Sequence, residues 1–220
     1  MRGKLMMTGA LGALAGVACM WAASVFAAPE FQLRGGRFRP LAYAELSPAQ
    51  KVLADAALAS GRKSLDGPLN ITLRSPEMAE LSRGLDAYLR FDSTAVPHKF
   101  KEIAIMLTAR FWGGQYVWYS HRQQALDSGL SAAFIDAMAA GARPADMSAD
   151  EAIVLDFCEE LLATRQVSDA HFKAMAERFG ERGIVELIGL MGRYHALTML
   201  FAVDRYPLPE GAREAIDRPK

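Results

Sequence analysis

Glu102 and His121 are the residues whose types and surroundings point most directly to chemistry. Glu102 shares one face of a predicted helix with Ile105 and Met106, three and four residues further on. His121 lies four residues after Val117 on the next predicted helix, beyond a pair of glycines. A carboxylate on an apolar face needs a polar partner. If the two helices pack as a hairpin, we expect Glu102 and His121 to meet inside it.

A paired glutamate and histidine can hold a proton and deliver it to a substrate atom. This chemistry suits decarboxylation, or proton movement at a carbon next to a carbonyl group. His121 would then donate the proton or stabilise an oxyanion, and Glu102 would orient His121. The alternative interpretation is structural, because a buried glutamate and histidine can satisfy one another and hold two helices in register. The residues by themselves leave both interpretations open.

Four further residues are candidates for contact with a substrate. Tyr116 is a third catalytic candidate, because its hydroxyl can donate a hydrogen bond to a bound carboxylate. Arg110 can clamp a carboxylate through two hydrogen bonds. Trp118 and His195 are candidate substrate-binding residues, and both also fit a core position. His98, at the start of a predicted helix, is interpreted as a surface residue.

Metal binding and thiol chemistry are poorly supported by the sequence. No pair of histidines or carboxylates has the close spacing of a zinc or iron site, although Glu102, His121 and His195 can converge in space. We therefore expect no metal and no cofactor. Cys158 lies on an apolar helical face, which favours a buried, inert thiol over a peroxidase nucleophile.

The spacing of Glu102 and His121 resembles a motif of the alkylhydroperoxidase D and carboxymuconolactone decarboxylase superfamily. The hydroperoxidase form of that motif reads Glu, eleven residues, Cys, two residues, Cys, three residues, His. In this chain Gly114 and Val117 stand at the two cysteine positions. The acid and the imidazole of the motif are therefore present, and both thiols are missing.

The surrounding sequence is similar to the decarboxylase-like branch of the superfamily over roughly residues 75–165. The resemblance rests on the run QYVWYSH and on a PLPEG tail at residues 207–211. It implies a cofactor-free lyase that handles a proton on a small carboxylated lactone or keto acid. It also implies a homo-trimer or homo-hexamer.

Two other functions stay open. One is a non-catalytic small-molecule-binding or scaffold protein of the same fold. The other is an alkylhydroperoxidase or peroxiredoxin-type activity, which the missing thiols disfavour because peroxide reduction needs a nucleophilic and a resolving cysteine.

The first 27 residues have the layout of a secretory signal peptide. Arg2 and Lys4 precede an apolar run, and small residues follow it up to Ala27. We expect export to a periplasm or secretion, with no membrane association after cleavage. Removal of this segment takes two of the 25 basic residues and none of the 25 acidic ones, which leaves a formal charge of −2. Such a balance disfavours nucleic acid as a partner.

The remaining chain reads as an arm at residues 28–46 and one helical domain at residues 47–220. Ser-Pro pairs predict helix starts at residues 48 and 76, and residues 66–75 read as a loop. The apolar segment 181–205 is expected to be the most buried helix. No strand pattern is evident, so we predict an all-α fold of seven or eight helices around a central hairpin. The three arginines of the arm, Arg34, Arg37 and Arg39, are interpreted as a basic loop or as contacts to an anionic ligand or a neighbouring subunit.

Overall fold

The structure is a computed structural model that describes residues 36–39, 41–60, 65 and 67–217. The predicted signal peptide and Arg34 lie outside the described residues. The described chain contains eight α-helices and no strand, which confirms the predicted all-α fold. The helices are α1 (Pro48–Ala59), α2 (Pro68–Thr72), α3 (Pro76–Ala87), α4 (His98–Phe111), α5 (Gln115–Asp127), α6 (Ala132–Ala139), α7 (Ala149–Thr164) and α8 (Asp169–Asp204), with a 3₁₀ turn at Tyr43–Glu45 and a π-helical turn, η2, at Tyr88–Asp92.

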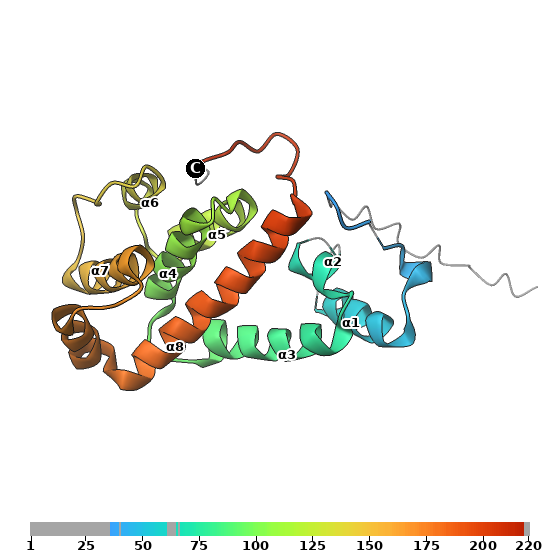
Figure 1. Ribbon diagram of the computed structural model, residues 1–220, viewed down its shortest axis with the longest axis horizontal. Helices are drawn as coiled ribbons and strands as arrows, with labels where there is room; N and C mark the ends of the chain where they lie inside the picture. Colours follow the sequence, from blue (N-terminus) through green and yellow to red (C-terminus); the bar gives the residue numbers. More distant parts are fainter. Residues whose placement is uncertain (1–35, 40, 61–64, 66, 218–220) are drawn as a thin grey trace, which may run out of the picture.

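α4 forms the centre of the fold. It packs against α5, α7 and α8, and every residue from Phe100 to Ala109 is buried. α8 crosses the molecule diagonally, with α6 and α7 on one side of it and α1, α2 and α3 on the other (Figure 1). The predicted hairpin is therefore present as α4 and α5.

α8 is less buried than the sequence predicts. Its apolar residues Val185, Ile188 and Val203 are exposed, because α8 is covered mainly on the side that faces α4. The expectation that this segment is the most buried helix was wrong, and α4 takes that place. By length and composition alone α8 would suffice to cross a membrane, a property that it shares with core helices of soluble proteins.

Serine caps and glycines set the helix ends much as the sequence predicts. Ser47 and Ser148 each accept a backbone hydrogen bond, at 3.3 Å, from the residue three positions later. Gly129 ends α5 with φ at 97°, and Gly180 interrupts α8 with φ at 71°. α2 falls within the segment 66–75 that was predicted to be a loop, so that prediction was wrong.

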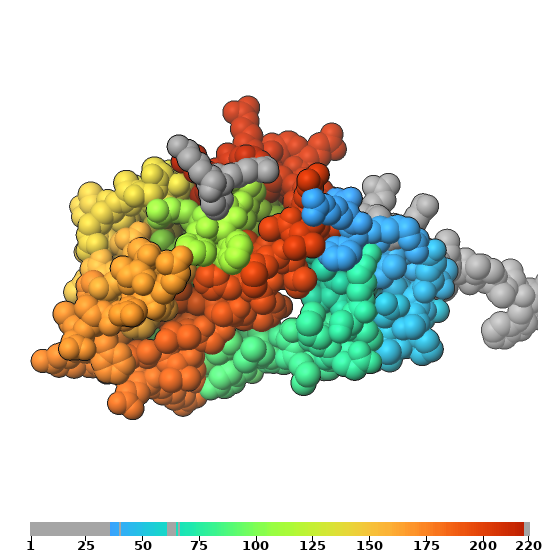
Figure 2. Space-filling model, viewed as in Figure 1, coloured from blue at the N-terminus to red at the C-terminus, as the bar shows by residue number. Residues whose placement is uncertain are grey.

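The arm docks on the end of α8. The backbone N–H groups of Arg37 and Phe38 donate to the carboxylate of Asp204 at 2.9 and 2.6 Å. Arg39 forms an ion pair with Glu45 at 3.0 Å within the arm itself. In the space-filling view, the surface is hollowed between α8 and the segment that contains α2 and α3 (Figure 2).

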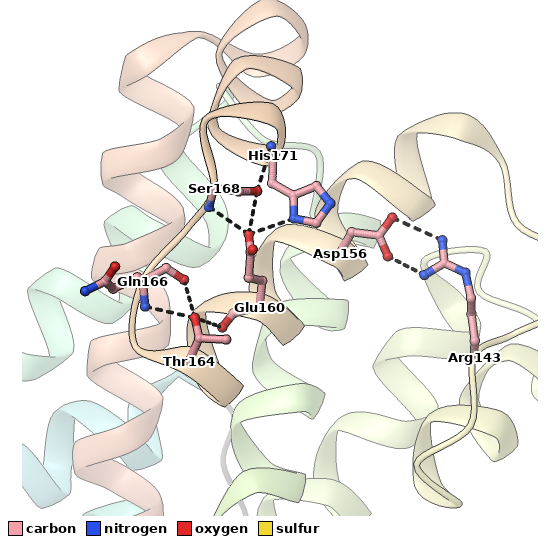
Figure 3. A network of polar contacts seen from close by, with 7 residues as sticks. All are labelled: Arg143, Asp156, Glu160, Thr164, Gln166, Ser168 and His171. Atoms are coloured by element: carbon pink, nitrogen blue, oxygen red, sulfur yellow. Dashed lines mark hydrogen bonds and ion pairs between the residues drawn. The ribbon is translucent and has the colours of Figure 1, made fainter.

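The connection between α7 and α8 is held by one carboxylate. Glu160 accepts hydrogen bonds from the backbone N–H and the hydroxyl of Ser168 and contacts His171 Nδ1 at 2.8 Å (Figure 3). These bonds lower the pKa of Glu160, the backbone bond from Ser168 contributing most. His171 thus has a structural partner at the surface. Arg143 and Asp156 form a neighbouring ion pair (Figure 3).

The π-helical turn η2 is fixed from two sides. Lys101, buried in α4, donates its ammonium protons to the carbonyl of Ser93 at 2.7 Å, and burial lowers its pKa. From α8, Glu186 accepts hydrogen bonds from Ser93, from Tyr88 and from Arg182. Burial alone would raise the pKa of Glu186, but these three donors lower it to about 2.

The lowered pKa of Glu186 predicts that the fold loses stability in acid. The pKa of Glu186 is lower in the folded than in the unfolded chain, so its stabilisation is complete above about pH 4.5 and is lost as the pH falls towards 2. We expect Glu186→Gln to lower the free energy of unfolding at pH 7 by about 1–2 kcal/mol and to flatten its decline in acid. Urea unfolding at pH 7 and pH 3 measures both effects. Glu181→Gln, at an exposed position on the same helix, is the control, and equal pH dependence in the two variants would contradict the assignment.

Candidate functional site

Glu102 and His121 meet inside the hairpin, as predicted. The Oε2 atom of Glu102 lies 2.7 Å from Nδ1 of His121. Glu102 is completely buried, and His121 is 5% exposed. When Glu102 is ionised its oxygens only accept hydrogen bonds, so Nδ1 of His121 then carries the proton and Nε2 is the nitrogen left for a substrate.

His98 is a second imidazole on the same carboxylate. Its Nε2 lies 3.4 Å from Oε1 of Glu102, within ion-pair distance, although Oε1 makes no hydrogen bond of good geometry. The His98 side chain is 41% exposed, so it connects the buried carboxylate to solvent. Its interpretation as a plain surface residue was incomplete. The signal was present in the sequence, because residues four apart on a helix lie on one face.

Tyr194 of α8 packs against the His121 ring. Its ring meets the His121 ring edge to face, with centroids 5.0 Å apart at 87°. Burial raises the pKa of the Tyr194 phenol, so it stays protonated at physiological pH. Neither Glu102 nor His121 lines any of the pockets that contain Tyr116, Arg110, Arg193 or Trp118.

Tyr116 lies apart from the acid–imidazole pair, in an aromatic cluster. Its ring packs against Phe201 at 5.0 Å and Tyr206 at 4.7 Å. The cluster lines a pocket of about 640 Å³ together with Gly114 and Thr198. The hydroxyl of Tyr206 also accepts a hydrogen bond from the Gly67 backbone N–H at 2.8 Å. Tyr116 thus forms part of the wall of this pocket.

Two predicted substrate contacts have structural partners elsewhere. Arg110 lies 3.5 Å from Glu159 and lines a pocket of about 450 Å³ between α4 and α7. It is eight residues beyond Glu102, about 12 Å further along α4. Trp118 is 1% exposed and belongs to the core, with one edge at a pocket beside α6. The structure does not bring Arg110 to the Glu102–His121 pair.

His195 is engaged by a neighbouring tryptophan. The indole N–H of Trp112 donates to Nδ1 of His195 at 2.6 Å, and burial lowers the pKa of the imidazole. This bond fixes the acceptor role of Nδ1, so His195 has its proton on Nε2 when neutral. His195 does not join Glu102 and His121. In the part of the chain that the structure describes, no group of three histidines, cysteines or carboxylates is arranged to hold a metal ion.

Comparisons with known proteins bear on the fold. No protein-family model matches the chain, and no curated protein sequence matches it. A crystal structure from Agrobacterium tumefaciens matches with a TM-score of 0.56, over 65% of this chain and 99% of that one, at 17% identity. That protein is described as one of unknown function and as a candidate antioxidant defence protein AhpD. The chain has an AhpD-like fold. At this identity the likeness establishes the fold and no activity.

The AhpD-like hairpin of this chain has no room for a side chain at the first missing cysteine position. A Cβ atom added to Gly114 would lie 2.4 Å from Cγ2 of Thr198 on α8, far inside van der Waals contact. Val117, at the second position, is 1% exposed and packs in the core. Cys158 on α7 is completely buried, and burial raises its pKa, so its thiol is inert. Thr198 and Val117 thus fill the space that a dithiol would need.

This packing predicts a penalty for any side chain at position 114. We expect Gly114→Ala to lower the free energy of unfolding by about 1–3 kcal/mol, because it overpacks the contact with Thr198. Thr198→Ser keeps the hydroxyl and removes the clashing methyl group, so it should recover much of that loss in the double variant.

Urea unfolding of the four proteins measures the coupling. Gly84→Ala is the matched control, because a Cβ atom at that helical position meets nothing within 4 Å. Strictly additive effects of Gly114→Ala and Thr198→Ser would show that the two positions do not compete for space.

Proposed function

We propose that this chain is a carboxymuconolactone decarboxylase-like lyase without a cofactor, which handles a proton on a small carboxylated lactone or keto acid. The observation that carries the proposal is the hydrogen bond of 2.7 Å between Glu102 and His121 inside the α4–α5 hairpin. The AhpD-like fold and the retained acid and imidazole of the motif support it. Membership of the alkylhydroperoxidase D and carboxymuconolactone decarboxylase superfamily is part of this proposal.

The proposed step needs one proton donor and one site for negative charge. The bond between the ring carbon and the carboxylate breaks, carbon dioxide leaves, and the electron pair moves onto the adjacent carbonyl oxygen to form an enolate. A proton on Nε2 of His121 is then delivered to the carbon, which regenerates the carbonyl group. The Glu102 carboxylate at Nδ1 lies beside the positive charge that the imidazole carries before this delivery.

His98 is the second imidazole beside the Glu102 carboxylate. Its imidazole is half-exposed and lies beside the second oxygen of Glu102. Delivery of the Nε2 proton leaves His121 neutral with its remaining proton on Nδ1, so the replacement proton has to reach Nε2 from the substrate side, and His98 acts on the charge of Glu102 alone. The functional unit in this proposal is the row His98, Glu102, His121.

The second candidate function is a non-catalytic binding or scaffold protein of the same fold. It is favoured by one observation, namely that Glu102 is completely buried and His121 is only 5% exposed. In that case Glu102 and His121 fix the hairpin and do no chemistry. Peroxide reduction by a thiol is not proposed, because Cys158 is buried and both motif cysteines are replaced.

Export and assembly complete the proposal. A signal peptide at residues 1–27 would direct the chain to the periplasm or outside the cell. A homo-trimer or homo-hexamer would cover the exposed apolar residues of α8, which include Val185 and Ile188.

The catalytic role of His121 predicts a specific loss of activity. His121→Asn keeps an N–H group near the Nδ1 position for Glu102 but removes Nε2, so we expect turnover to fall by about 10²-fold or more with the fold retained. The assay follows ultraviolet absorbance of the mature protein with carboxylated lactones and keto acids, after a thermal-shift screen for ligands.

His171→Asn is the matched control, because His171 also pairs with a glutamate, at 2.8 Å, but lies at the α7–α8 connection. It should leave turnover unchanged. If no compound is turned over by the wild type, or if His121→Asn is fully active, the lyase proposal fails and the scaffold function is favoured.

A further inference from the structure

A pocket of about 350 Å³ lies between the N-terminal helices α1, α2 and α3 and α8. Its volume falls at the small end of the range for small-molecule sites. Most of its wall is apolar and is formed by residues such as Leu53, Ala57, Leu69, Ala79 and Phe91. These residues offer a surface for a hydrocarbon chain or ring, which gains free energy by leaving water.

Arg193 of α8 places a nearly buried cation in this wall. Its side chain is 10% exposed, and its buried Nε atom makes no hydrogen bond. Among the described residues its ion partner is Asp86, whose Oδ1 atom lies 3.4 Å from Nε and is likewise without a hydrogen bond. A buried polar atom left without a hydrogen bond is costly, so the Nε atom of Arg193 and the Oδ1 atom of Asp86 are poorly satisfied by this contact.

The second arginine of the pocket is already engaged. Arg83 makes two hydrogen bonds with Glu80 on the same turn of α3, at 2.6 and 3.1 Å, and its side chain is 64% exposed. Of the two arginines that line the pocket, Arg193 is the one with a buried Nε atom that makes no hydrogen bond. Asp86 is 27% exposed, so its carboxylate reaches water when another anion takes the guanidinium.

We propose that this pocket binds a small amphipathic monocarboxylate, with its carboxylate on Arg193 and its apolar body against α1, α2 and α3. A guanidinium binds a carboxylate through two parallel hydrogen bonds, which the contact with Asp86 does not provide. The site is separate from the proposed proton-transfer chemistry, since neither Glu102 nor His121 lines it.

Isothermal titration calorimetry with octanoate tests the proposal, with octanamide as the uncharged ligand of the same shape. Octanoate should bind at one site, and octanamide roughly tenfold more weakly or worse, because it lacks the charge-assisted hydrogen bonds. Arg193→Gln should weaken octanoate binding by roughly the same factor. Arg178→Gln, which breaks an ion pair with Asp150 elsewhere on α8, should leave binding unchanged.

A second variant tests the pocket without changing the charge of Arg193. Ala56 is exposed at the pocket, so Ala56→Trp fills the space without disturbing the core, and it should also abolish octanoate binding. His121→Asn should bind octanoate normally, which separates this site from the lyase proposal. The proposal is overturned if octanoate does not bind, if octanamide binds equally well, or if neither Arg193→Gln nor Ala56→Trp weakens binding.

Discussion

The Glu102 carboxylate lies in the second turn of α4, the most buried helix, with an imidazole beside each of its oxygens. A charged group in this position is stable only when it is paired, because removal from water costs several kcal/mol per ion. α4 and α5 therefore have to pack in the register that brings His121 to Oε2. The first turn of α4 must also keep His98 near Oε1.

The other helices can be understood as the frame that this pairing needs. α8 supplies Tyr194 against the His121 ring and, one turn later, Thr198 against Gly114. Lys101 and Glu186 fix the π-helical turn that precedes α4, and so fix the start of the helix that carries His98 and Glu102. Gly114 and Val117 fill the two positions where the motif has its cysteines, so this hairpin holds an acid and an imidazole and no thiol.

Features that depend on the spacing of residues along a helix could be predicted from the sequence. The all-α fold, the hairpin, the serine caps and the meeting of Glu102 with His121 follow from apolar periodicity and from capping residues. The contact of His98 with Glu102 was also readable, at a spacing of four residues, but its position at a helix start suggested the surface.

The parts that depend on contacts between distant segments could not be predicted. Arg110 points to Glu159 on α7, and His195 is held by Trp112, because tertiary packing decides which neighbour each side chain finds. α2 was missed since a helix of five residues that begins at a proline gives little periodicity, and burial of Ile71 stabilises it. The pairing of Arg193 with Asp86 joins residues more than a hundred positions apart.

The central claim is that Glu102 holds the proton of His121 on Nδ1 and leaves Nε2 for chemistry. Nitrogen–proton correlation spectroscopy of the imidazole rings, in the wild type and in Glu102→Gln, tests it most directly. We predict a slowly exchanging Nδ1 proton on His121 in the wild type, shifted downfield by the carboxylate and moved upfield or lost in Glu102→Gln. A wild-type His121 that carries its proton on Nε2 alone, or an unchanged Nδ1 signal in the variant, would contradict the account.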